Sequence, residues 1–312
     1  MRKFIFLFCI LSSFISISQN SDEVGTISLS IVTPENSDEL SQVQLSKLKT
    51  RLTKIATTNG LSGSGFNSNF VLYPVFDIYN QELIEGMENI VIVGVEVSLF
   101  VKQVDNNLIF SSYTLQIDGS GNDKNEAIVD AISQIPLNNE KIKSFLSESK
   151  KKIISYYEAQ CANIAKQAET AAGMSDFEKA FGILMSVPKE VSCSSQLSAL
   201  SIKIYKGYQN KICNENLLKA KAEISAGNYD EALYILSYID PASTCFSEAK
   251  SLIGSIETKV SAERKKEWDF KMKQYDNSVE LEKQRINAVK DIAVAYYQRT
   301  QPTYNYNLLI VK

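Results

Sequence analysis

Four cysteines stand at spacings that could support covalent chemistry: Cys161, Cys193, Cys213 and Cys245. Their successive separations are 32, 20 and 32 residues. Zinc-binding cysteines usually come in close pairs, which this spacing lacks. The chain contains no histidine, so no imidazole is available to activate a thiol nucleophile. The pattern therefore predicts disulfide bonds, with four unpaired buried thiols as the alternative.

The chain begins with the pattern of a secretory signal peptide, which we assign to residues 1–18. Arg2 and Lys3 form a short basic region, and residues 4–17 are mostly apolar. Small residues precede the expected cleavage site, and the apolar stretch is shorter than the ~20 residues needed to span a bilayer. We therefore expect an exported protein without a transmembrane segment.

Removal of the signal peptide would also remove the fifth cysteine, Cys9, and leave an even number of cysteines. Cys9 follows Phe8 rather than a small residue, so it does not fit a lipid attachment site. We expect the mature protein in the periplasm of a bacterial envelope or associated with the outer membrane.

The composition argues against several classes of function. The 312 residues carry a net charge of −3, which gives no electrostatic reason to bind nucleic acid or an anionic membrane surface. Carboxylates are plentiful, but Glu82 and Glu85 lie in a polar stretch that is typical of solvent-facing charges. We expect a protein that is not an enzyme and that binds no metal or cofactor.

Residues 19–140 have the pattern of an α+β domain. Apolar and polar residues alternate over 27–32, and residues 70–78, 89–104 and 108–117 also have strand-like sequences. Two amphipathic helices are expected, at 38–58 and from Asn122 or Asp123 to Ile135. This order predicts an antiparallel sheet with helices on one face.

The sequence GSGNDKNEAIVDAI leads from the last of these strands into the second helix. It resembles the envelope domain shared by the curli-secretion channel protein and the lipoprotein activators of penicillin-binding proteins. The resemblance covers about a third of the chain, and it implies a domain that binds proteins or assembles into rings. The matching positions are Gly119, Gly121, Ala127, Ile128, Ala131 and Ile132.

Residues 141–260 contain two ungapped copies of a 52-residue unit, each with the pattern of a helical hairpin. The aligned pairs are Cys161 with Cys213, Ala168 with Ala220, Phe177 with Tyr229, Ala180 with Ala232, Leu184 with Leu236, and Cys193 with Cys245.

The second copy resembles the tetratricopeptide repeat at its turn. Gly227 begins the turn, Tyr229 supplies the aromatic residue, and Ala232 is a small residue that lets two helices approach closely. The first copy departs from this turn at Met174, Ser175 and Asp176. The period also differs from that of the family, and a plain helical bundle remains the alternative.

The hairpin geometry predicts how the cysteines pair. Cys161 lies 12 residues before Gly173, which is ~18 Å along a helix. The return helix from Phe177 covers a similar distance back and brings Cys193 beside Cys161. By the same count we predict the bridges Cys161–Cys193 and Cys213–Cys245, each worth roughly 3–4 kcal/mol.

A long helix with a heptad pattern is predicted over residues 261–300, followed by a strand-like tail at 301–312. The helix either mediates self-association or partner binding, or folds back on its own repeats. The tail is expected to add to a sheet edge or to a partner. The heptad positions that we predict as partner-binding candidates are Trp268, Met272, Tyr275, Val279, Ile286 and Tyr296.

These patterns together predict an all-α hairpin region and a long C-terminal helix after the α+β domain. The function that they favour is that of an exported, non-enzymatic protein that binds protein partners through its helical repeats and its heptad helix. The alternative is a structural subunit, and thus a homo-oligomer, in a ring or envelope-spanning assembly of the secretion or phage type.

Overall fold

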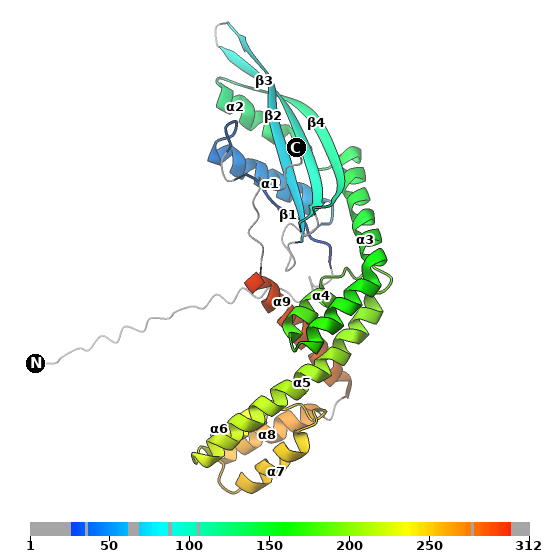
Figure 1. Cartoon of the computed structure of the whole chain (residues 1–312). Helices are drawn as coiled ribbons and strands as arrows, with labels where there is room; N and C mark the ends of the chain where they lie inside the picture. Colours follow the sequence, from blue (N-terminus) through cyan, green and yellow to red (C-terminus); the bar gives the residue numbers. More distant parts are fainter. Residues whose placement is uncertain are drawn as a thin grey trace, which may run out of the picture.

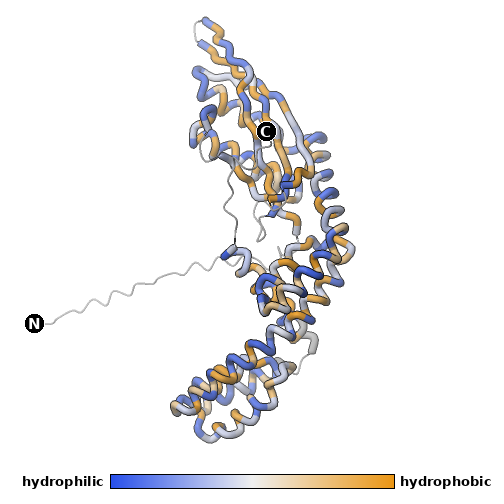
Figure 2. Tube along the Cα trace, in the orientation of Figure 1, coloured by the Kyte–Doolittle hydropathy of each residue, from blue (hydrophilic) through white to orange (hydrophobic). Residues whose placement is uncertain are grey.

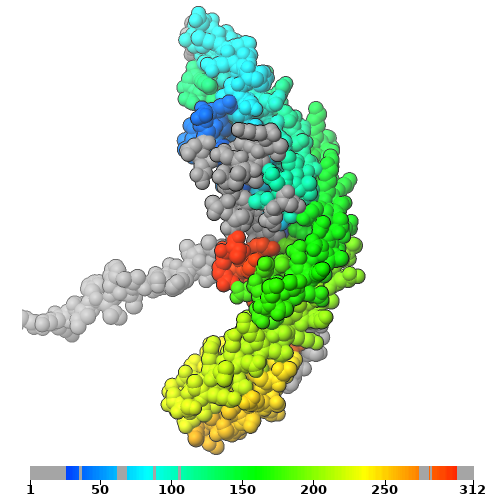
Figure 3. Space-filling view, viewed as in Figure 1, coloured from blue at the N-terminus to red at the C-terminus, as the bar shows by residue number. Residues whose placement is uncertain are grey.

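Figure 1 shows a computed structural model of the chain. It describes residues 26–34, 37–61, 69–86, 89–104, 107–275 and 278–300. The predicted signal peptide and the predicted strand-like tail lie outside the described residues. The fold is α+β, as predicted: a sheet covered by helices lies at one end of an elongated molecule, and helical hairpins extend to the other (Figures 1 and 3).

The sheet has the strand order β1-β2-β3-β4. Its strands are β1 (Ser30–Ile31), β2 (Phe70–Ile84), β3 (Ile90–Gln103) and β4 (Ile109–Gly121). The last three are antiparallel neighbours, whereas β1 pairs in parallel with the start of β2. The prediction of a purely antiparallel sheet is therefore wrong at this edge, because helix α1 (Gln42–Thr58) carries the chain back between the two strands.

Helices α1, α2 (Lys124–Gln134) and the first part of α3 (Glu140–Gly173) cover one face of the sheet. Alternate residues of β3 face them, and Val93, Val95 and Val97 are fully buried. Asp123 caps α2 by accepting a hydrogen bond from the backbone N–H of Glu126.

The GSG segment has a steric reason at its first glycine. Helix α2 passes so close to β4 that a Cβ atom on Gly119 would lie 2.1 Å from the carbonyl oxygen of Ala127 and 2.7 Å from the Cβ of Ala131. Only glycine fits at this contact, and small residues on α2 allow the same approach from the other side.

Two helical hairpins follow the sheet. The first consists of α3 and α4 (Phe177–Met185), and the second of α5 (Ser194–Ser225) and α6 (Tyr229–Leu236). The structure joins Cys161 to Cys193 and Cys213 to Cys245, with Cα atoms 6.2 and 6.1 Å apart. This is the pairing that the helix geometry predicts.

The two hairpin turns place different residues at the same position of the repeat. Gly227 has a φ of +81° at the second turn, and Ser175, which aligns with it, has a φ of +62° at the first. The left-handed region carries no steric penalty for glycine but costs roughly 1–2 kcal/mol for residues with a Cβ atom. Gly173, which the pattern suggested as the interruption, is the last residue of α3 instead.

Replacing Ser175 by glycine is therefore expected to stabilise the protein by about 1 kcal/mol, because it relieves this penalty at the turn. The matched change Gly227→Ala should destabilise it by a similar amount. Urea unfolding of the two variants beside the wild type measures both effects. A loss of stability in Ser175→Gly would show that the serine side chain matters more to the first turn than the backbone conformation does.

The chain ends in three helices: α7 (Phe246–Ile256), α8 (Ala262–Tyr275) and α9 (Ser278–Thr300). The heptad pattern predicted over 261–300 falls on two described helices, of which α8 packs on α6 whereas α9 packs on α4.

The buried side chains form one large and two small clusters, besides a few residues on the other face of the sheet. Figure 2 shows how hydrophobic and hydrophilic residues intersperse along the helices and strands. The large cluster runs from the sheet through the first hairpin and includes Val289 and Ala293 of α9. The small clusters lie in the second hairpin and its neighbours α7 and α8. No helix among the described residues is long and apolar enough to cross a membrane.

Candidate functional site

The end of the molecule far from the sheet forms a lobe with its own pocket, and we call residues 210–275 the distal lobe (Figure 1). The pocket has a volume of about 440 Å³ and lies between α6, α7 and α8. Its walls are mostly apolar, with charged side chains at the rim. The apolar lining consists of Leu233, Pro241, Phe246, Ile253, Ile256, Val260, Trp268 and Met272.

Helix α6 packs into the core of the distal lobe because one side of it is strongly apolar. Ala232, Leu233 and Leu236 are buried at 0–2% exposure. Trp268 packs against this same cluster from α8.

Cations on α8 pack on one tyrosine of α6 and on a second tyrosine just after the end of that helix. The Lys271 ammonium lies 3.8 Å from the centroid of the Tyr238 ring and donates to the Ser237 hydroxyl at 3.0 Å. The Arg264 guanidinium lies 5.0 Å from the centroid of the Tyr234 ring. Such contacts contribute about 0.5–1 kcal/mol each at exposed sites. They hold α8 against the second hairpin and fix its orientation there.

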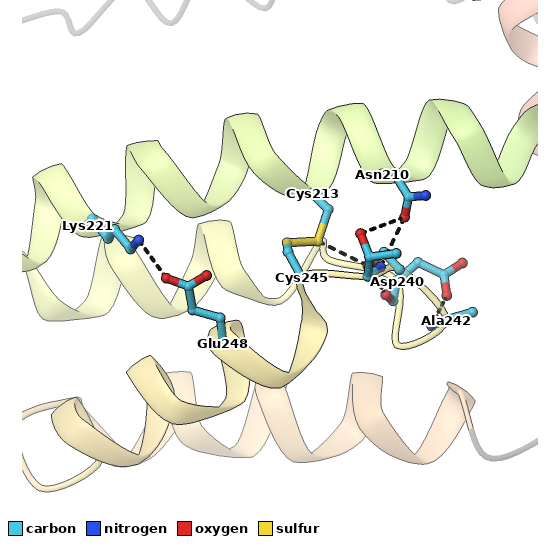
Figure 4. The surroundings of a disulfide bond; sticks show 9 residues. Asn210, Cys213, Lys221, Asp240, Ala242, Cys245 and Glu248 are labelled. Atoms are coloured by element: carbon cyan, nitrogen blue, oxygen red, sulfur yellow. Dashed lines mark hydrogen bonds and ion pairs between the residues drawn. A yellow bond between two sulfur atoms is a disulfide. The ribbon is translucent and has the colours of Figure 1, made fainter.

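The disulfide Cys213–Cys245 fixes the start of α7 to α5, and Figure 4 shows its surroundings. Asn210 accepts a hydrogen bond from the backbone N–H of Thr244 at 3.0 Å. One turn beyond the bridge on α7, Glu248 pairs with Lys221 of α5 at 2.6 Å. These contacts hold one wall of the pocket in a fixed position relative to α5.

The rim of the pocket carries permanent charges. Glu257 and Lys265 form an ion pair at one side of the opening, and Lys250 and Asp269 also line it. The hydrogen bond from Lys265 lowers the pKa of Glu257, and the same contact raises the pKa of Lys265. Both groups are therefore charged at neutral pH, and neither is tuned for proton transfer.

The structure separates the predicted partner-binding residues into two places. Trp268 and Met272 line the distal pocket together. Ile286 lies in a crevice between α4 and α9, and the Tyr296 ring packs over Gly182, where an added Cβ would come within 2.5 Å of it. Tyr275 and Val279 stand at the end of α8 and the beginning of α9, and their side chains lie outside the described part.

Several residues of the site were not identified from the sequence. Tyr234 lies on α6 and Tyr238 lies two residues beyond its end, and their ring centroids are 5.0 Å apart. The KMK sequence around Lys271 supplies the cation that packs on them. Both signals are visible in the sequence, but only the fold brings them together.

No group of three or more histidine, cysteine, aspartate or glutamate side chains is arranged to hold a metal ion within the described ranges. Three comparisons, with protein families, with curated proteins and with solved structures, found no match to this chain.

Proposed function

We propose that this is an exported, non-enzymatic binding protein of a bacterial envelope, and that its distal pocket receives apolar side chains of a protein partner. The observation that carries the proposal is the pocket itself: a preformed apolar cavity of about 440 Å³ that contains Trp268 and opens to solvent. Protein interfaces derive most of their binding energy from a few apolar or aromatic side chains that fill such pockets.

The rigidity of the distal lobe supports this assignment. A pocket that is already formed costs less ordering on binding than one that a partner must open. The disulfide Cys213–Cys245, the cation–π contacts of α8 and the small buried core all act on the walls of this one cavity. Two disulfides also favour export, because such bonds persist in oxidising compartments.

The charged rim supports binding rather than catalysis. Glu257 and Lys265 form an ion pair with each other. A rim of fixed charges around an apolar centre is the usual organisation of a protein interface, in which the polar border sets orientation and the centre supplies affinity.

Gly254 allows a sharp test, because it lines the pocket and an added Cβ would meet no atom within 4 Å. We expect Gly254→Phe to fill the cavity and to abolish partner capture, while Gly254→Ala keeps it. A photo-reactive residue at exposed Lys250 would capture the partner from the envelope fraction, and mass spectrometry would identify it. Far-UV circular dichroism checks that both variants remain folded, because the single tryptophan, Trp268, lines the cavity itself and would respond to its filling.

Capture of the same protein by wild type, Gly254→Ala and Gly254→Phe would contradict the role of the pocket. Capture that is equal when the photo-reactive residue is moved to Lys203 on α5, away from the pocket, would do so as well.

A second candidate function is that of a subunit in a ring or envelope-spanning assembly. The observation that favours it is that β2 and β4 lie at opposite sides of the antiparallel part of the sheet, which permits head-to-tail pairing of subunits. Light scattering of the purified protein distinguishes the two functions. A defined ring-sized oligomer supports the subunit, and a monomer supports the binding protein.

A further inference from the structure

The hairpin formed by β2 and β3 extends past the helices that cover the rest of the sheet (Figure 1). We call its outer part, residues 75–84 and 90–96, the β-arm. Four large apolar side chains are about half exposed on it: Tyr79 at 55%, Leu83 at 54%, Ile84 at 49% and Ile90 at 43%. A cluster of this kind on a projecting element marks an interaction surface more than scattered exposed residues do.

One edge of the β-arm is open. Strand β1 pairs only with Val71 and Leu72 of β2. From Val75 to Ile84, no other described strand lies on that side. Alternate residues of a strand direct their backbone N–H and C=O groups to opposite sides. A β-bulge after Ile78 shifts this alternation by one residue. Phe76 before the bulge, and Gln81 and Leu83 after it, therefore direct their backbone groups to this edge.

The edge already binds one acceptor from within the chain. The backbone N–H of Ile78 donates to the carboxylate of Glu39. Burial raises the pKa of Glu39, and the nearby Asp77 adds to this, whereas the hydrogen bond from Ile78 and the charge of Lys124 lower it. The open edge therefore presents donors, and its surroundings are acidic.

The charges of the β-arm all have one sign. No lysine or arginine occurs between Lys54 and Lys102 in the sequence. Asp77 lies directly opposite Glu96 across the β2–β3 pair, and Glu96 receives a hydrogen bond from the neutral Gln116. Like charges placed directly opposite on a sheet destabilise it. No cation of the described part forms an ion pair with either carboxylate.

We infer that the open edge of the β-arm binds an extended polypeptide strand in which basic and apolar residues alternate. Backbone hydrogen bonds along residues 75–84 hold the strand in line with β2, which is the general mode of strand addition. Its basic side chains neutralise Asp77 and Glu96 on one face of the sheet. Its apolar side chains lie on the opposite face, beside Leu83. Tyr79, Ile84 and Ile90 share the face of the two carboxylates, where the apolar stems of the basic side chains pack on them. A second copy of the same edge is disfavoured, because it would bring carboxylates together.

The inference concerns a surface separate from the distal pocket, so it holds or fails independently of the proposed function. Three labelled nine-residue peptides test it on the full chain by fluorescence anisotropy: alternating lysine and valine, alternating glutamate and valine, and the lysine peptide with a central proline. We expect only the first to bind, at least tenfold more weakly at 300 mM than at 50 mM salt.

Two variants measure separately how much the carboxylates and the backbone donors of the edge contribute to peptide binding. The double variant Asp77→Asn, Glu96→Gln should weaken peptide binding at least threefold and leave the protein equally or more stable. Unfolding would also weaken binding, but it would lower the stability. Gln81→Pro removes an edge donor and should weaken binding at least tenfold, with Gln81→Ala as its matched control. Equal binding of the proline-containing peptide, or no binding of any peptide to the folded protein, would overturn the inference. If no peptide binds, the acidic residues and the bulge would instead protect the edge from pairing with other strands.

Discussion

Replacing Cys213 and Cys245 by alanine is expected to unfold the distal lobe while the sheet and the first hairpin stay folded. The bridge spans 32 residues of sequence, and the chain-entropy treatment assigns about 4 kcal/mol to closing such a loop. The core of the lobe is small: seven buried residues around the bridge, two of which are the cysteines themselves, and three more in a neighbouring cluster. A loss of this size is comparable to the whole stability of a small lobe.

The first bridge supplies the matched control, because its loop has the same length. Cys193 belongs to the large cluster that also contains the sheet and part of α9. Its hairpin is therefore held by extensive apolar contacts that the bridge does not provide. We expect Cys161→Ala with Cys193→Ala to lower the stability of the whole protein without releasing a separate unit.

Limited proteolysis with mass mapping, together with Trp268 emission, distinguishes the two outcomes. The Cys213/Cys245 variant should be cut within residues 210–275 and show a red-shifted tryptophan, while the Cys161/Cys193 variant at 25 °C should show neither. A single transition that includes the distal lobe in both variants would mean that the lobe is not an independent unit of stability.

The cysteine pairing could be predicted because it depends on local geometry. The rise of a helix and the spacing of the breaks in the chain fix how far Cys193 travels back toward Cys161, and no long-range contact is needed. The same holds for the buried alternation of β3 and for the Asp123 cap of α2. In each case the signal lies within about 35 residues.

The division of the heptad pattern between two helices could not be predicted on that basis. Apolar spacing states that one side of a helix is buried, but not which surface buries it. Trp268 packs against the second hairpin and Val289 against the first. The distal pocket, with lining residues from Leu233 to Met272, and the parallel pairing of β1 depend on contacts of the same long-range kind.

Exchanging Arg285 for methionine is expected to be among the most destabilising single substitutions on α9, at about 2–4 kcal/mol. The Arg285 guanidinium binds both oxygens of Asp240, with its Nε 3.0 Å from one and its Nη2 2.8 Å from the other. Asp240 lies at the end of the second hairpin and is only 5% exposed. Without the arginine, the carboxylate keeps a single described donor, the backbone N–H of Ala242, and stays buried with an uncompensated charge.

A second ion pair on the same helix provides the control. Arg299 pairs with Glu178 of α4, but both side chains are about half exposed or more, so Arg299→Met should cost less than about 1 kcal/mol. Urea unfolding measures the difference, and adding Asp240→Asn to Arg285→Met should recover part of the loss, because it removes the buried charge. Equal costs at Arg285 and Arg299 would contradict a buried pair that ties α9 to the distal lobe. The attachment of α9 would then rest mainly on its other contacts with the first hairpin, among them those of Val289, Ala293 and Tyr296.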